Sequence, residues 1–141
     1  VRAEVEGNLI RLSNNSGGWW PQYDTTTHYL TIGGINGTWD DGESLVISIM
    51  GFHGPGYYPM SPGFDPGTSW GAYSCQPDRS YSPLGWEGDN VTILSFDSLT
   101  GEVSGTFEFR AVSGEGGPVF HIRDGQFQVI PTKYGSAPGT D

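Results

Sequence analysis

The sequence has one cysteine, few basic residues and no long apolar segment. Its single cysteine, Cys75, can form no intramolecular disulfide and has no partner cysteine for a metal site. No apolar run approaches the ~18 residues of a membrane-spanning helix. Lysine and arginine together number 6 against 16 acidic residues, so the net charge is −10. This charge disfavours nucleic acid and anionic membranes as partners, because both present negative phosphates.

Sequence signals of catalysis are also scarce. Neither a Gly-x-Gly-x-x-Gly loop nor a Gly-Lys-Ser/Thr phosphate loop is present. The histidines His28, His53 and His121 are scattered and form no metal-ligand spacing, although His53 lies in a glycine-rich loop where it can line a cleft. We therefore predict a protein that is not an enzyme. A glycoside hydrolase using a carboxylate pair such as Glu102 and Glu108 ranks third, after the structural and binding functions predicted below.

Glycine, proline and aromatic residues are abundant instead. There are 23 glycines and 10 prolines, together with five tryptophans, seven tyrosines and seven phenylalanines. Glycine and proline alone would suit a disordered chain, but an aromatic content of 13% interleaved with β-branched residues argues for a packed core. The combination is typical of short strands joined by many turns.

Alternating apolar and polar residues predict an antiparallel meander in the last third of the chain. Its strands are expected at residues 91–96, 102–112, 119–123 and 126–130, with turns at residues 97–101, 113–117 and 124–125. Asp124-Gly125 is the expected turn between the last two strands.

Earlier segments add further strands. These are expected at residues 2–6, 8–12, 28–35, 43–50 and 68–75, with a short edge strand around Tyr57-Tyr58. Residues 43–50 are apolar on both faces, which indicates a central strand. Loops are expected at residues 13–27 and 76–89. Altogether the sequence predicts one all-β domain over residues 1–131, an antiparallel sandwich or flattened barrel of about eight to ten strands, followed by a polar tail at residues 132–141.

Two segments resemble a known family. The run TILSFDSLTGEVSGTFEFRAV and the later FHIRDGQFQVI are similar to the C-terminal pattern of secreted Bacteroidota proteins known as domain of unknown function 6252. The opening AEVEGNLIRL resembles the start of that family, whereas residues 51–89 depart from it in length. The resemblance implies a bacterial β-sandwich exported to the extracellular space or outer cell surface, often from a lipid-anchored precursor. It implies no activity and no catalytic residues.

Aromatic residues in the expected loops are candidate ligand contacts. Flat rings can stack on sugar faces, and tyrosine and tryptophan also anchor protein interfaces. The alternative is that these loops fold back and bury their own rings. The candidate residues are Trp19, Trp20, Tyr23, Tyr57, Tyr58 and Trp86.

The N-terminal strand suggests a second kind of function. A terminal strand can complete the sheet of a neighbouring molecule, and Val1, Ala3, Val5 and Leu9 would form such a linkage. The simpler alternative is an ordinary edge strand of the same chain. Our leading prediction is a non-catalytic, self-associating structural protein of the cell surface, forming fibres or oligomers. A glycan- or protein-binding module is the second.

One acidic turn is a candidate calcium site. Asp40, Asp41 and Glu43 bring hard oxygen donors together, and calcium is the cation that such donors prefer. Their spacing is not that of an EF-hand, and acidic residues also favour solvated turns. The sequence requires no other cofactor.

Overall fold

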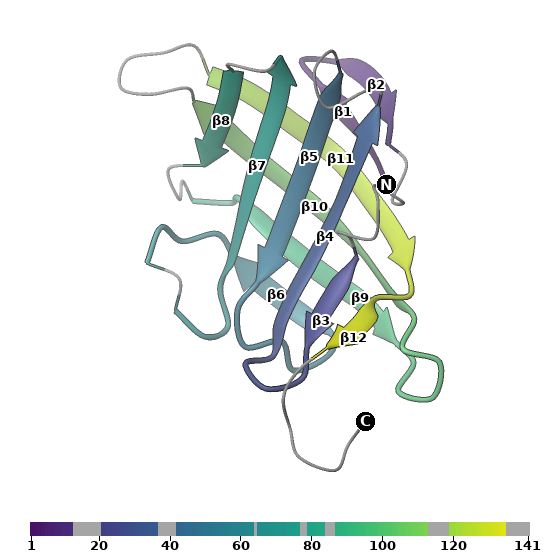
Figure 1. Ribbon diagram of the computed structural model, residues 1–141. Coiled ribbons are helices and arrows are strands. Elements are labelled where there is room, and N and C mark those ends of the chain that lie inside the picture. The colour runs from purple at the N-terminus through teal and green to yellow at the C-terminus, as the bar shows by residue number, and fades with distance from the viewer. Residues whose placement is uncertain are drawn as a thin grey trace.

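Two sheets packed face to face make up the protein (Figure 1). The computed structural model describes residues 1–12, 21–36, 42–63, 65–76, 79–83, 87–112 and 119–134, which contain twelve strands and no helix. The predicted all-β sandwich or flattened barrel is therefore confirmed, with more strands than the eight to ten expected.

The two sheets are named after their central strands. The β10 sheet contains β1 (Arg2–Val5), β2 (Asn8–Arg11), β6 (Gly56–Pro59), β9 (Asn90–Phe96), β10 (Val103–Val112) and β11 (Val119–Val129). The β5 sheet contains β12 (Thr132–Tyr134), β3 (Gln22–Asp24), β4 (Tyr29–Asn36), β5 (Glu43–Ile49) and β7 (Ser69–Gln76). Strand β8 (Arg79–Pro83) pairs with both β7 and β10, so it joins the sheets along one side.

The core lies between the sheets and follows from strand alternation. Every second residue of β10 from Val103 to Ala111 is buried, because neighbouring side chains on a strand point to opposite faces. Strand β5 pairs with β4 on one side and β7 on the other, which confirms its predicted central place. The largest fully buried side chains are those of Tyr58, Phe107, Phe109, Leu30, Ile32, Leu45, Ile47, Ile49, Ile122, Val91 and Val103.

The predicted turn at Asp124-Gly125 is wrong, because both residues lie inside one continuous strand, β11. The register runs from Phe107 opposite Gly125 to Phe109 opposite Ile122, so β11 carries one extra residue at this point. Asp124 takes the left-handed conformation, with φ of 50°. These features define a β-bulge, for which Asp and Gly are as well suited as they are for a turn.

Three short strands occur where the sequence indicates loops or tail. Strand β3 lies within the loop expected at residues 13–27, β8 within the loop at 76–89, and β12 at the start of the expected tail. Each has only three to five residues, too few for a clear alternating pattern. Their neighbours in the sheet stabilise them instead: β12 pairs in parallel with β3, and β3 pairs with β4.

Candidate functional site

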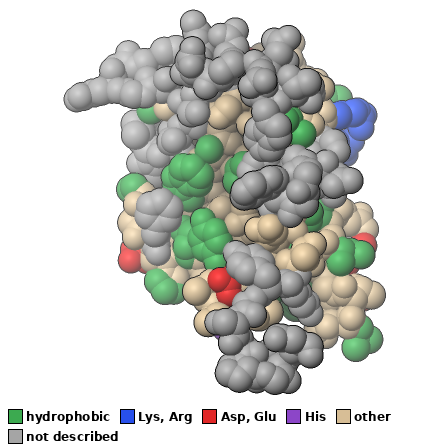
Figure 2. Space-filling view, viewed as in Figure 1, with side chains coloured by type: hydrophobic (Ala, Val, Ile, Leu, Met, Phe, Trp, Pro, Cys, Tyr) green, Lys and Arg blue, Asp and Glu red, His purple; other side chains and the backbone are tan. Residues whose placement is uncertain are grey.

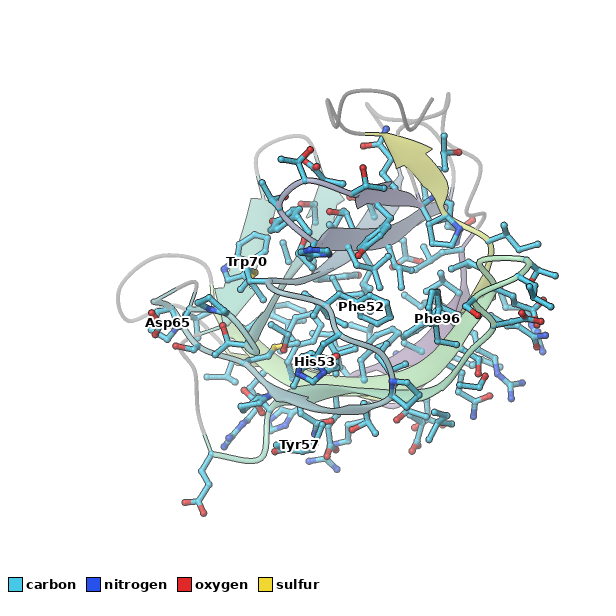
Figure 3. All side chains as sticks on the ribbon, turned by 90° about the horizontal axis from the view of Figure 1, so that it is seen from below. Phe52, His53, Tyr57, Asp65, Trp70 and Phe96 are labelled. Atoms are coloured by element: carbon cyan, nitrogen blue, oxygen red, sulfur yellow. The ribbon has the colours of Figure 1, made fainter. Side chains whose placement is uncertain are left out.

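An open aromatic groove lies at one end of the sandwich, the lower end in Figure 1. It has a volume of about 430 Å³ and is lined by Tyr23, His28, Gly51, Phe52, His53, Gly54 and Phe96. We call it the end groove. Figure 3 looks onto this end and shows Phe52 and Phe96 close together, with His53 near them.

Three rings in edge-to-face contact form the floor of the end groove. The ring centres of Phe52 and Phe96 are 5.3 Å apart, and those of Tyr23 and Phe52 are 5.8 Å apart. Phe52 is 7% exposed, whereas 37% of Phe96 is open to solvent. Edge-to-face pairs contribute about 0.5–1.5 kcal/mol beyond the area they bury. The rings therefore form a stable surface of which one member, Phe96, is presented to the solvent.

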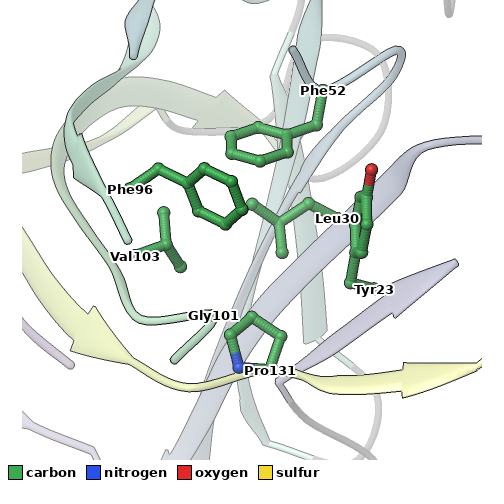
Figure 4. A pocket seen from close by; sticks show the side chains of 7 residues that line it. All are labelled: Tyr23, Leu30, Phe52, Phe96, Gly101, Val103 and Pro131. Atoms are coloured by element: carbon green, nitrogen blue, oxygen red, sulfur yellow. The ribbon is translucent and has the colours of Figure 1, made fainter. Parts of the chain in front are cut away.

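Beneath the rings the sandwich is almost filled. A narrow pocket between the sheets is lined by Tyr23, Leu30, Phe52, Phe96, Gly101, Val103 and Pro131 (Figure 4). Its volume is about 10 Å³, which is at the lower limit for one water molecule. This narrow pocket is too small for a sugar or a larger ligand, whereas the end groove above the rings is open.

The loop between β3 and β4 places His28 at the rim of the end groove. The Asp24 side-chain Oδ1 accepts hydrogen bonds from the backbone N–H groups of Thr26, at 2.8 Å, and Thr27, at 3.3 Å. His28 has φ of 59°, and its N–H donates to the Asp24 carbonyl oxygen at 2.8 Å. The Tyr23 hydroxyl lies 2.7 Å from His28 Nδ1. Burial raises the pKa of Tyr23, with smaller contributions from Asp24 and Tyr58.

The Asp24 loop is expected to loosen in acid. The Thr26 N–H, followed by that of Thr27, holds the pKa of Asp24 below its ordinary value of 3.8. A lowered pKa in the folded state means that the carboxylate stabilises the loop above the unfolded-state pKa, and that this contribution is lost as pH falls through the folded-state pKa. We expect the protection of the Thr26 amide from exchange, measured against the rate of an unfolded chain at the same pH, to fall as the pH falls below 3.8. Unchanged protection of this amide between neutral pH and pH about 2 would contradict this role for the carboxylate.

Tyr58 is not a ligand contact, so this part of the sequence prediction is wrong. The residue is fully buried, and its hydroxyl donates to the Gly54 carbonyl oxygen at 2.7 Å and accepts from the His53 N–H at 3.1 Å. It thereby fixes the loop that carries His53. Its neighbour Tyr57 points the other way, because adjacent residues of β6 face opposite sides, and it is 57% exposed on the outer face (Figure 3).

Among the predicted ligand contacts that the structure describes, Tyr23 lies in the end groove and Tyr57 does not line it. Trp19, Trp20 and Trp86 are outside the described residues. Sequence reasoning did not select Phe52 and Phe96, although it noted that His53 can line a cleft. The signal for Phe96 was weak, since it ends a strand whose alternation is broken by a bulge opposite Ser104 and Gly105.

The residues predicted for assembly divide between core and surface. Ala3 and Val5 are buried, and β1 is paired on one side with β11 and on the other with β2. Strand β1 is therefore an inner strand, and donating it to another molecule would break both pairings. Leu9 is 56% exposed on β2, which pairs only with β1 within the described part of the chain, and Val1 is half-buried.

Of the three predicted calcium ligands, Glu43 is the one that the structure describes. Glu43 accepts hydrogen bonds from Asn36 Nδ2 at 3.1 Å and from the Tyr73 hydroxyl at 2.8 Å. Asp40 and Asp41 lie outside the described residues. Within the residues that the structure describes, no three His, Cys, Asp or Glu side chains gather in a way that could hold a metal ion.

One motif of the sequence resembles that of a catalytic serine but was not among the predicted sites. Residues 67–71 read Gly-Thr-Ser-Trp-Gly, which matches the Gly-x-Ser-x-Gly pattern of hydrolases. That chemistry requires an exposed serine on a turn from a strand into a helix. Ser69 is instead fully buried at the start of β7, and its hydroxyl donates to the Tyr58 carbonyl oxygen at 2.7 Å. It holds β7 to the end of β6.

Comparison with known proteins finds no match among family models, curated proteins or solved structures. The resemblance to domain of unknown function 6252 therefore stays a prediction. Within the described residues no helix has the length and hydrophobicity to cross a membrane.

Proposed function

We propose that this chain is a non-catalytic binding domain of the extracellular space or outer cell surface, and that it binds a saccharide in the end groove. The observation that carries the proposal is the continuous contact of Tyr23, Phe52 and Phe96, with two histidines at its rim. Sugar rings have apolar faces and polar edges. Aromatic rings with hydrogen-bonding groups beside them match both.

The size and lining of the end groove support this class of ligand. A volume of about 430 Å³ falls within the range of small-molecule sites. Its polar groups are the imidazoles of His28 and His53 and the Tyr23 hydroxyl, which can donate or accept hydrogen bonds. No carboxylate lines the groove among the described residues. A pair of carboxylates is the usual requirement for glycoside hydrolysis, so binding without cleavage is favoured.

A glycan array followed by calorimetry on the best binder tests the proposal. Phe96→Ala removes the exposed ring and His53→Ala removes one imidazole. We expect each to weaken binding about tenfold, which corresponds to ~1.4 kcal/mol. Leu99→Ala is the matched control, because Leu99 is 94% exposed in the turn after β9 and does not line the groove. An array without binders, or equal weakening by Leu99→Ala, would contradict the proposal.

Self-association is the second candidate function, and the edge of β2 that pairs with no other described strand favours it. Leu9 presents an apolar side chain at that edge, where backbone groups can pair with another strand. Light scattering of the wild-type chain should then show oligomers or fibres that Leu9→Lys disperses. Dispersal by a chelator would add calcium to the linkage. A monomer of 15.2 kDa at every concentration would exclude this function.

A further inference from the structure

The basic side chains that the structure describes gather on one face. Among the residues whose side chains are described, the basic ones are Arg2, Arg11, Arg110 and Arg123, and all belong to the β10 sheet. Arg2, Arg110 and Arg123 alternate with buried neighbours, and Arg11 lies opposite Arg2, so all four face outward. Figure 2, which looks onto the opposite β5 sheet, shows little blue except at one edge.

Most of these arginines form no ion pair with another described residue. Arg110 forms an ion pair with the buried Asp89 at 3.2 Å and donates to the Glu87 carbonyl oxygen at 2.9 Å. In the described part of the chain, Arg2, Arg11 and Arg123 form no ion pair. Arg2 donates from Nε to Gln126 Oε1 at 3.1 Å, which fixes its guanidinium without neutralising it. Unpaired arginines are unexpected in a chain with 16 acidic residues, which could easily supply partners.

Arg2 and Arg11 lie directly opposite each other in the hairpin of β1 and β2. Like charges in this position destabilise a strand pair, so the hairpin would be more stable with one of them neutral. An open groove of about 410 Å³ lies beside them, lined by Val1, Arg2, Arg11, Leu12, Gln126, Phe127 and Gln128. We call it the arginine groove. No carboxylate is among these residues, so an anion placed there meets only positive and neutral groups.

The arginine groove continues a polar row across the sheet. Strand pairing aligns Tyr57 with Thr92, Thr92 with Thr106, Thr106 with Gln126, Gln126 with Arg2, and Arg2 with Arg11. With strands about 4.8 Å apart, the row is roughly 24 Å long. It begins at the exposed ring of Tyr57, continues through hydroxyl and amide groups, and ends at two guanidinium groups. An extended polymer can contact these groups one after another along the row.

We propose that this row binds an anionic polysaccharide, with its carboxylate or sulfate groups held by Arg2 and Arg11. Guanidinium groups bind both anions through pairs of charge-assisted hydrogen bonds. Thr106 and Gln126 hydrogen-bond sugar hydroxyls, and Tyr57 stacks on a ring at the far end. Two carboxylates lie beside the middle of the row, since Glu108 and Asp124 line a groove together with Thr106 and Gln126. The anionic groups of the polymer are therefore held at the arginine end, and uncharged sugar units cross the middle. Acidic groups farther than about 8 Å from the row are screened at physiological salt. The site is separate from the end groove and does not depend on it.

Affinity electrophoresis with defined polymers tests the proposal. The probes are polygalacturonate, which carries carboxylates, dextran sulfate, which carries sulfates, and neutral dextran as the reference. We expect the wild-type chain to be retarded by at least one anionic polymer and not by dextran, with weaker retardation as salt rises. Preference for one polymer identifies the anion. No retardation by either polymer at low salt would overturn the proposal.

Charge-matched variants show where the polymer binds. Arg2→Gln and Arg11→Gln should each weaken binding about tenfold, as expected for a lost charge-assisted contact. Arg123→Gln removes the same charge outside the arginine groove and should change binding less than twofold. The Tm of Arg11→Gln should equal or exceed that of the wild type, since the opposed charges are relieved. Equal losses in all three variants would indicate general charge attraction and overturn the site.

Two further results distinguish polymer binding in the arginine groove from binding in the end groove and from dimer formation. Phe96→Ala should leave polymer binding unchanged, so the arginine groove can stand or fail independently of the end groove. If Arg11→Gln instead dissociates a concentration-dependent dimer and no polymer binds, then a second copy of the chain occupies the groove. That result would overturn the polysaccharide assignment.

Discussion

Replacing Gly125 with alanine is expected to lower the free energy of unfolding by about 2–3 kcal/mol, because it overfills a closed part of the core. A Cβ atom at Gly125 would lie 2.4 Å from the nearest ring carbons of Phe107. Phe107 is 2% exposed, and its ring packs against the rings of Phe109 and Phe127. The ring therefore cannot move aside without disturbing its neighbours. Urea denaturation followed by tryptophan fluorescence measures the loss.

A double-mutant cycle identifies the cause of that loss. Phe107→Leu destabilises by itself, but it removes the ring atoms that the new methyl group would meet. Adding Gly125→Ala to Phe107→Leu should cost at least 1 kcal/mol less than in the wild type, roughly the coupling expected for residues in contact. Gly71→Ala, whose Cβ would lie 3.0 Å from Phe109, is a milder comparison. Purely additive losses would mean that contact with the Phe107 ring is not the cause of the destabilisation.

Phe52→Ala is expected to cost about 3–4 kcal/mol and to abolish binding in the end groove. Phe52 touches three other rings, those of Tyr23, Tyr58 and Phe96, so its removal opens a cavity among all of them. Phe96→Ala should cost only about 1 kcal/mol, because Phe96 is 37% exposed. Thermal unfolding measures both values.

Amide exchange at residue 52 distinguishes loss of the Phe52 ring from unfolding of the domain. The Phe52 N–H donates to the His28 carbonyl oxygen at 2.8 Å, a bond that alanine can also form. In the Phe52→Ala variant this amide should remain protected from exchange while saccharide binding disappears. Binding that survives in a folded Phe52→Ala variant would show that the rings are not the contact surface.

Sequence patterns predict the parts of the fold in which local and tertiary preferences agree. The segment at 43–50 is apolar on both faces, which requires cover on both sides, and β5 is indeed central. Asp124-Gly125 is different, because the same two residues suit a hairpin turn and a bulge. Only their pairing with β1 and β10 selects the bulge. Strands β8 and β12 depend on neighbours in the same way.

The candidate site was harder to predict because it is assembled from distant segments. Phe52 follows β5 and Phe96 ends β9, and nothing in the local sequence of either residue indicates the other. Tyr57 and Tyr58 show a second difficulty. Adjacent strand residues face opposite sides, and two identical side chains give no hint of which one is buried. The arginine pair likewise becomes visible only through the register of β1 and β2.

The pairing of β1 with β11 affects how the chain can be made. Arg2 lies opposite Gln126, which is 124 residues further along the sequence, so β1 can pair with β11 only after β11 has been synthesised. Until then Ala3 and Val5 have no core to enter, and the strand edge that β11 will cover stays open to other chains. Contacts between such distant residues also slow folding, typically to milliseconds or seconds. The hairpin of β1 and β2 is therefore a segment to which a chaperone could bind during synthesis.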